Sequence, residues 1–178
     1  MQRVLARFGD IAVAVFAADW QLVWWNRGWA ALLGDPSASP PRLRNFARDR
    51  FPVGTGPARL ALWPVIEADR DATDAAVVSD LRRATGRFPQ DSRLATLIRD
   101  LNAGNSRFAE LWATGAVAVH CEDHKTIDHP SVGPVTVDCD ILTDGDSELK
   151  IVVMTAVPGS EDETKLQLAA VTGVVTQR

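Results

Sequence analysis

The chain has 178 residues, of which 46% are hydrophobic and 24% are charged, a composition that fits one globular domain over residues 1–178. Its formal net charge of −4 is opposite to what phosphate binding requires, so we do not expect this chain alone to bind nucleic acid. The apolar N-terminal stretch contains Arg3, Arg7 and Asp10, which argues against a signal peptide. No apolar run reaches the roughly 18 residues of a membrane span, and we therefore expect a cytoplasmic protein without membrane contact.

The first fifty residues predict two strands and two short helices. Residues 11–16 form an apolar run of strand length, and residues 21–25 follow after a turn, so the two predict a hairpin. Asn26 can end the second strand and cap a helix over residues 27–33, which stops at Gly34. A second short helix is expected over residues 43–50.

The middle of the chain is expected to be helical. From residue 57 an apolar stripe predicts a helix or helix pair that ends at Gly86, before Pro89. Asp91 or Ser92 begins a further helix that ends at Gly104. Ser106 is placed to cap another helix, which Gly115 ends. The stripe consists of Leu62, Ile66, Thr73, Val77, Leu81 and Ala84.

The last third of the chain switches to strands. Residues 117–119 and 135–141 alternate with period two, and residues 129–133 make the turn between their strands. Residues 149–157 are apolar on both faces, as in a central strand, and residues 161–175 predict a closing helix. The fold class is therefore α+β, an antiparallel sheet of about five strands with a helical block inserted between strands two and three.

The sequence gives little support for a catalytic site or for a metal site. Histidines occur at positions 120, 124 and 129, but on a strand His120 and His124 stand about 13 Å apart, too far for one zinc ion. His129 is expected to hydrogen-bond backbone in the turn. An enzyme that uses His124 or His129 with Asp138 as acid and base is the weakest hypothesis, because no convergent motif accompanies these residues. We expect no metal, no cofactor and no enzymatic activity.

A series of short motifs in fixed order extends over residues 10–171. The motif positions are Trp25-Asn26, Leu33-Gly34-Asp35, Asn45, Phe51, Trp63, Leu81-Arg82, Ser106, Phe108, Leu111-Trp112, His129-Pro130, Gly133 and Val152–Ser160. Together they resemble the ligand-binding domain of MmyB-like transcription regulators, a PAS-like sensor that follows an Xre-type helix-turn-helix domain. The chain shows no helix-turn-helix, and we expect it to be part of a longer regulator.

The resemblance implies a sensor for a small apolar molecule of the fatty-acid class, which can form a homodimer and reaches DNA only through the missing domain. Burying the ligand's methylenes contributes about 0.8 kcal/mol each. Arg82, or alternatively Arg59, is expected to hold a carboxylate head with two hydrogen bonds. The expected ligand-binding residues are Phe51, Trp63, Leu81, Arg82, Phe108 and Trp112.

The alternative is an interaction module without a small-molecule ligand. The chain has six tryptophans and no tyrosine. Trp24 and Trp25 point to opposite faces of one strand, so one of them is available to a partner. In this hypothesis Trp20, Trp24 or Trp25 forms the partner surface, and side chains fill the pocket.

Overall fold

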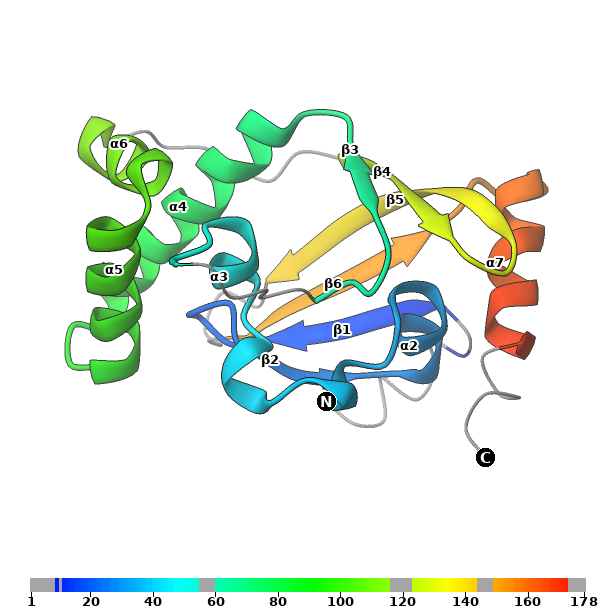
Figure 1. Cartoon of the computed structure of the whole chain (residues 1–178), viewed down its shortest axis with the longest axis horizontal. Helices are drawn as coiled ribbons and strands as arrows, with labels where there is room; N and C mark the ends of the chain where they lie inside the picture. The colour runs from blue at the N-terminus through cyan, green and yellow to red at the C-terminus, as the bar shows by residue number, and fades with distance from the viewer. Residues whose placement is uncertain (1–8, 10, 55–59, 116–122, 144–148, 173–178) are drawn as a thin grey trace.

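A computed structural model of the chain describes residues 9, 11–54, 60–115, 123–143 and 149–172. Its α+β fold is built on a six-stranded antiparallel open sheet with the strand order β2-β1-β6-β5-β4-β3 (Figure 1). The first and last strands, β1 and β6, therefore pair in the middle, and the expected central position of β6 is confirmed. The strands are β1 (Ala12–Phe16), β2 (Leu22–Trp25), β3 (Val65–Glu67), β4 (Asp123–His129), β5 (Gly133–Thr143) and β6 (Lys150–Thr155).

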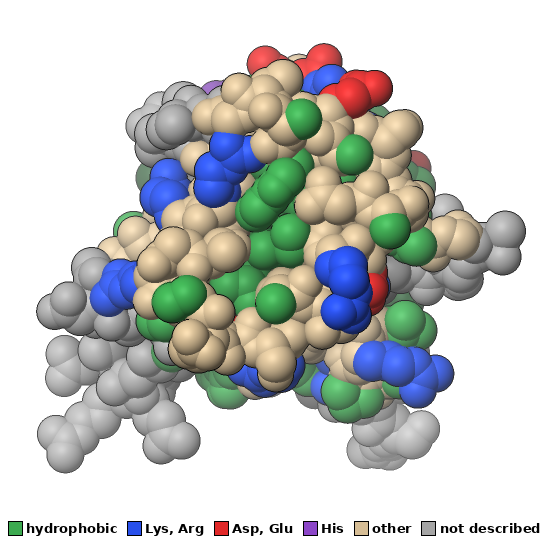
Figure 2. Space-filling model, turned by 90° about the vertical axis from the view of Figure 1, so that its left-hand side faces the viewer, with side chains coloured by type: hydrophobic (Ala, Val, Ile, Leu, Met, Phe, Trp, Pro, Cys, Tyr) green, Lys and Arg blue, Asp and Glu red, His purple; other side chains and the backbone are tan. Residues whose placement is uncertain are grey.

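The described helices lie at the two ends of this sheet and on one of its faces (Figure 1). Helices α5 and α6 lie at one end of the molecule, packed on each other and on α4, and α7 lies at the other end beside α2 (Figure 1). On the side of α5 and α6, hydrophobic side chains gather in a central hollow with Lys and Arg side chains around it (Figure 2). The α-helices are α2 (Arg27–Leu33), α3 (Phe46–Arg50), α4 (Arg70–Arg87), α5 (Ser92–Gly104), α6 (Ser106–Thr114) and α7 (Glu161–Thr172), and the 3₁₀ helices are η1 (Pro36–Ala38) and η2 (Pro41–Leu43).

Side-chain caps determine where several helices begin. Asn26 accepts a hydrogen bond from the Trp29 backbone N–H at 2.9 Å, and Asp91 caps α5 in the same way, so both predicted starts are confirmed. The prediction that Ser106 caps α6 is wrong. Ser106 is the first residue of this helix, and the preceding residue, Asn105, caps it by accepting a hydrogen bond from the Phe108 N–H. Gly115 ends α6 in the left-handed conformation, with a φ of 69°.

The predicted helix from residue 57 is wrong over its first part. Residues 65–67 form the edge strand β3, and α4 begins only after Asp69, whose side chain caps it. Leu62 and Ile66, predicted to be buried, are 55% and 64% exposed. The sheet consequently has six strands, and β3 divides the helices that were expected as one block. A three-residue strand is too short to show a period of its own, and pairing with β4 is what orders it.

The two faces of the sheet carry different buried clusters. On one face alternate residues of β1 and β5 pack with the helices, and the predicted inward alternation of Val135, Val137 and Cys139 is confirmed. On the other face Val13, Val15 and Val153 form a smaller cluster. The strand predicted at residues 117–119 lies outside the described residues.

Candidate ligand-binding site

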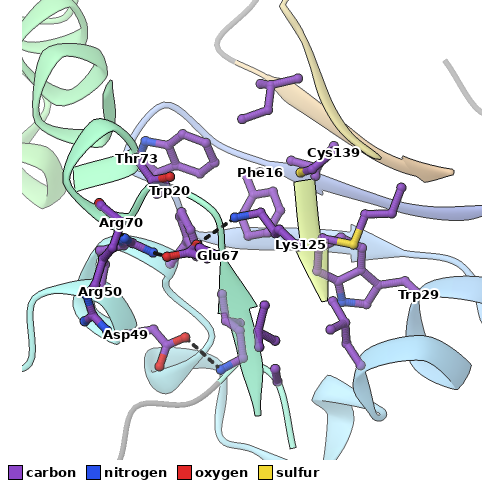
Figure 3. A pocket seen from close by; sticks show the side chains of 18 of the residues that line it. Phe16, Trp20, Trp29, Asp49, Arg50, Glu67, Arg70, Thr73, Lys125 and Cys139 are labelled. Atoms are coloured by element: carbon purple, nitrogen blue, oxygen red, sulfur yellow. Dashed lines mark hydrogen bonds and ion pairs between the residues drawn. The ribbon is translucent and has the colours of Figure 1, made fainter. Parts of the chain in front are cut away.

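A cavity of about 460 Å³ lies between the first of these sheet faces and the segments that carry α2, α3 and β3 (Figure 3). Its floor is formed by side chains of the central strands, among them Val152 and Met154 of β6 and Cys139 and Ile141 of β5. Aromatic side chains form a wall, and charged side chains gather at one end. The aromatic residues are Phe16, Trp20, Trp29, Phe46 and Trp63.

Trp20 is central to the aromatic wall. Its ring centroid lies 5.6 Å from that of Phe16 and 5.1 Å from that of Phe46. The backbone of Trp20 has a φ of 60°, which is uncommon for a residue with a large side chain. Hydrogen bonds from the Trp20 N–H to Ala17 and from the Phe46 N–H to the Trp20 carbonyl, both 2.9 Å, hold this conformation. The hairpin between β1 and β2 therefore places the indole at the cavity.

Lys150 also contacts the Trp20 ring. Its ammonium group lies 4.8 Å from the ring centroid and donates a hydrogen bond to the Ala18 carbonyl at 3.2 Å. Burial lowers the pKa of Lys150, and attraction from Asp80 only partly opposes this effect. Trp20 thus both lines the cavity and contacts a buried cation.

The C-terminal end of α2 is attached to the cavity wall by three hydrogen bonds. The last carbonyls of a helix have no partner within the helix and need one from elsewhere. Here two side chains and one backbone N–H supply the donors, so the wall cannot move away from α2 without breaking them. The pairs are His129 Nε2 with Ala31 O (2.9 Å), Trp63 Nε1 with Leu32 O (2.6 Å) and Leu62 N with Leu33 O (2.8 Å).

The same contacts determine the tautomer of His129. The Ala31 carbonyl can only accept, so Nε2 carries the proton, and Nδ1 accepts a hydrogen bond from the Ser131 N–H at 3.2 Å. The ring is therefore neutral and buried. The prediction that His129 hydrogen-bonds backbone in the turn is confirmed.

The charged end of the cavity contains a buried ion-pair network. Arg50, the last residue of α3, pairs with Glu67 of β3 and with Asp74 of α4, the latter at 2.5 Å. Lys125 of β4 pairs with the other oxygen of Glu67 at 2.7 Å. Two cations and two carboxylates thus balance one another where α3, α4, β3 and β4 meet.

The pKa values of this network favour its charged form. Burial opposes the charge on Arg50, but hydrogen bonds and attraction from Glu67 and Asp74 outweigh it, so the pKa of Arg50 is raised. Burial likewise favours a neutral Glu67, but Arg50 and Lys125 outweigh it and lower the pKa of Glu67. Glu67 therefore stays ionised at neutral pH and continues to compensate both cations.

Of the six residues expected to bind ligand, Trp63 lines this cavity. Leu81, Phe51 and Phe108 are buried in the core, where the Phe51 and Phe108 rings meet edge to face at 5.2 Å. Trp112 is half-buried and stacks on Phe108, with ring centroids 5.7 Å apart. These four are not among the residues that line the cavity, and their role in ligand binding stays a prediction.

Arg82 is engaged at the C-terminal end of α6. Its guanidinium donates to the Trp112 carbonyl and lies over the Trp112 ring, 4.9 Å from the centroid. A cation at this position stabilises the unpaired carbonyls of the helix end. Arg82 is not among the cavity-lining residues, and Arg59 lies outside the described residues. A role of Arg82 in holding a carboxylate stays a prediction.

Sequence reasoning missed most of the cavity. Trp29 and Leu33 are four residues apart on α2 and both line it, and this helical spacing was a usable signal for an apolar wall. The charged residues Arg50, Glu67 and Lys125 gave no such signal. Charged side chains are usually exposed, and these three are distant in the sequence and meet only in the folded chain.

Two further findings concern metal binding and membrane spanning in the described part of the chain. Within it, no group of three or more His, Cys, Asp or Glu side chains could hold a metal ion. Of the helices that the structure describes, none is long and apolar enough to cross a membrane. The cavity has the volume and the largely apolar lining that are typical of a small-molecule site.

Comparison with known proteins agrees with the resemblance noted from the sequence motifs. No curated protein matches the chain. A family model, described as the MmyB-like transcription regulator ligand binding domain, matches residues 1–169, which is almost the whole chain. The chain therefore belongs to the family of MmyB-like transcription regulator ligand-binding domains.

Proposed function

We propose that this domain is a PAS-like sensor that binds one small, largely apolar molecule of the fatty-acid class in the cavity beside Trp29 and Trp63. The observation that carries the proposal is an apolar chamber with charged side chains at one end only. Such a chamber suits an amphipathic molecule, whose chain and head need different surroundings.

The size of the cavity supports a ligand of this class. Its volume of about 460 Å³ lies within the roughly 300–1,000 Å³ typical of small-molecule sites. Each methylene that moves from water into the chamber contributes about 0.8 kcal/mol, before the costs of ordering the chain. An acyl chain therefore gains affinity mainly from its length, and the charged end orients it.

Binding would reach a DNA-binding domain through the elements that form the wall. Trp29 belongs to α2, which packs on α7, and a ligand that prefers one arrangement of this pair shifts the population toward it. An attached or partner helix-turn-helix domain would then take a different position on DNA. A homodimer of the regulator is compatible with this mechanism.

The proposal is tested by native mass spectrometry of the purified protein, beside a denatured control. We expect an excess mass of a few hundred daltons that is lost on denaturation and extracts into organic solvent. Protein without bound ligand is then titrated with dodecanoic acid. A bare native mass together with no saturable binding of this acid would refute the proposal.

Exposed apolar residues on β2 favour a second function, an interaction module. Val23 and Trp24 lie on this edge strand and are 50% and 37% exposed. Trp20 cannot belong to such a surface, since it is 1% exposed, and Trp25 is half-buried beneath Arg44. Light scattering of the ligand-free protein and a Trp24→Ala variant tests this hypothesis, which predicts an assembly that the variant loses.

A further inference from the structure

The cationic side chains at the charged end of the cavity differ in whether they already have an anionic partner. Arg50 and Lys125 are buried and share the carboxylate of Glu67, and Arg50 also pairs with Asp74. A ligand carboxylate that approached either cation would compete with these buried partners. Removing one partner from a buried pair is costly, so neither cation is readily available to a ligand.

Arg70 is different. It lines the same end of the cavity, its side chain is exposed, and none of the ion pairs among the described residues involves it. Its backbone position is well defined, because it follows the helix cap Asp69 and because its carbonyl accepts a hydrogen bond from Arg50 Nη2 at 2.9 Å. The buried network therefore positions Arg70 without using its charge.

The two ends of the cavity differ in charge and in exposure to solvent. The side chains of Arg70 and Trp29 lie on opposite sides of it (Figure 3). Because Arg70 is exposed, a carboxylate beside it keeps part of its hydration, and the desolvation cost that burdens a buried charge is small. The apolar chain then extends toward Trp29 and the strand floor.

We propose that the Arg70 guanidinium binds the carboxylate of a linear carboxylic acid at the charged end of the cavity and so determines the specificity for an acid. This inference rests on the proposed function, and it assigns the head of the ligand to Arg70 in place of Arg82. Asp49 lies at the same end, where its carboxylate accepts a hydrogen bond from the Leu60 N–H at 3.4 Å.

The test compares decanoic acid with 1-decanol, which has the same chain without the carboxylate, by titration calorimetry at pH 7. Guanidinium–carboxylate hydrogen bonds at a partly hydrated site predict that the wild-type protein binds the acid about fivefold to tenfold more tightly. In Arg70→Gln this ratio should fall close to one while the affinity for 1-decanol is retained. Arg70→Lys, which keeps the charge but loses the planar fork, should retain part of the ratio.

Two control variants make the assignment specific. Arg99→Gln removes an arginine of α5 whose side chain is 72% exposed and which is not among the cavity-lining residues, so the ratio should not change. Arg82→Gln tests the arginine favoured by the sequence. Circular dichroism checks that each variant is folded.

Several results would overturn the assignment. Arg70 is excluded if the wild-type protein binds 1-decanol as tightly as the acid, a result that needs no variant, or if Arg70→Gln keeps the full ratio. A ratio that collapses in Arg82→Gln but not in Arg70→Gln assigns the head to Arg82. If the wild-type protein binds neither probe, the proposed function itself fails.

Discussion

Trp63 and His129 meet edge to face, with ring centroids 5.1 Å apart, and donate hydrogen bonds to the adjacent carbonyls of Leu32 and Ala31. Trp63 precedes β3 and His129 ends β4, so the pair joins one edge of the sheet to the end of α2. Because Trp63 also lines the cavity, this contact determines the shape of the chamber as well as the stability of the fold.

Replacing Trp63 with Phe should weaken this junction. The change keeps an aromatic ring but leaves the Leu32 carbonyl without its donor, which should lower the free energy of unfolding by about 1–2 kcal/mol. Urea denaturation measures the effect. Trp24→Phe on the exposed edge strand is the matched control and should change stability much less; equal losses in the two variants would contradict this role of Trp63.

Replacing Glu67 with Gln should have the largest effect on stability among these variants. The neutral amide leaves Arg50 and Lys125 buried with too little opposing charge, and breaking such a network costs about 3 kcal/mol or more. Glu161→Gln is the control, because Glu161 pairs with Lys165 on the surface of α7 and should show no measurable change. A Glu67→Gln variant as stable as the wild-type protein would show that the network adds nothing.

The same network predicts how stability depends on pH. The pKa of Glu67 in the folded protein lies below its usual value of 4.5, so the unfolded chain binds a proton at a higher pH than the folded protein does. The stability that Glu67 contributes is fully present above pH 4.5 and is lost as the pH falls through the folded-state pKa. Denaturation at a series of acidic pH values should show this loss in the wild-type protein and a shallower one in Glu67→Gln. Parallel pH profiles would contradict the assignment.

The start of the chain could be predicted from sequence because local rules and tertiary structure agree there. Asn26 and Gly34 mark the two ends of α2 through a side-chain cap and a positive φ of 91°, and both are local properties. Likewise, the alternation in residues 135–141 predicts which side chains of β5 point inward, since one face of the strand is buried.

The cavity could not be predicted in the same way. It depends on β3, a strand of three residues whose order comes from pairing with β4, and on buried charges that local patterns assign to the surface. Aromatic residues also gave an ambiguous signal. The sequence favours Phe108 as a pocket wall and Trp20 as part of a partner surface. In the structure Trp20 lines the chamber and Phe108 does not, because the turn after β1 directs Trp20 there.

Filling the cavity should separate folding from ligand binding. Val152 lies on β6 with its side chain at the cavity floor, so Val152→Phe places additional atoms in the space that we assign to the ligand. The folded state tolerates the larger side chain because the space is already open. Val23→Phe makes the same change at an exposed position of β2 and should leave both stability and binding unchanged.

Titration calorimetry of dodecanoic acid into the wild-type protein, Val152→Phe and Val23→Phe tests the central claim most directly. We predict saturable binding of one acid per chain to the wild-type protein and to Val23→Phe, and no detectable binding to a folded Val152→Phe. Equal binding by all three proteins would place the ligand outside this cavity and contradict the account.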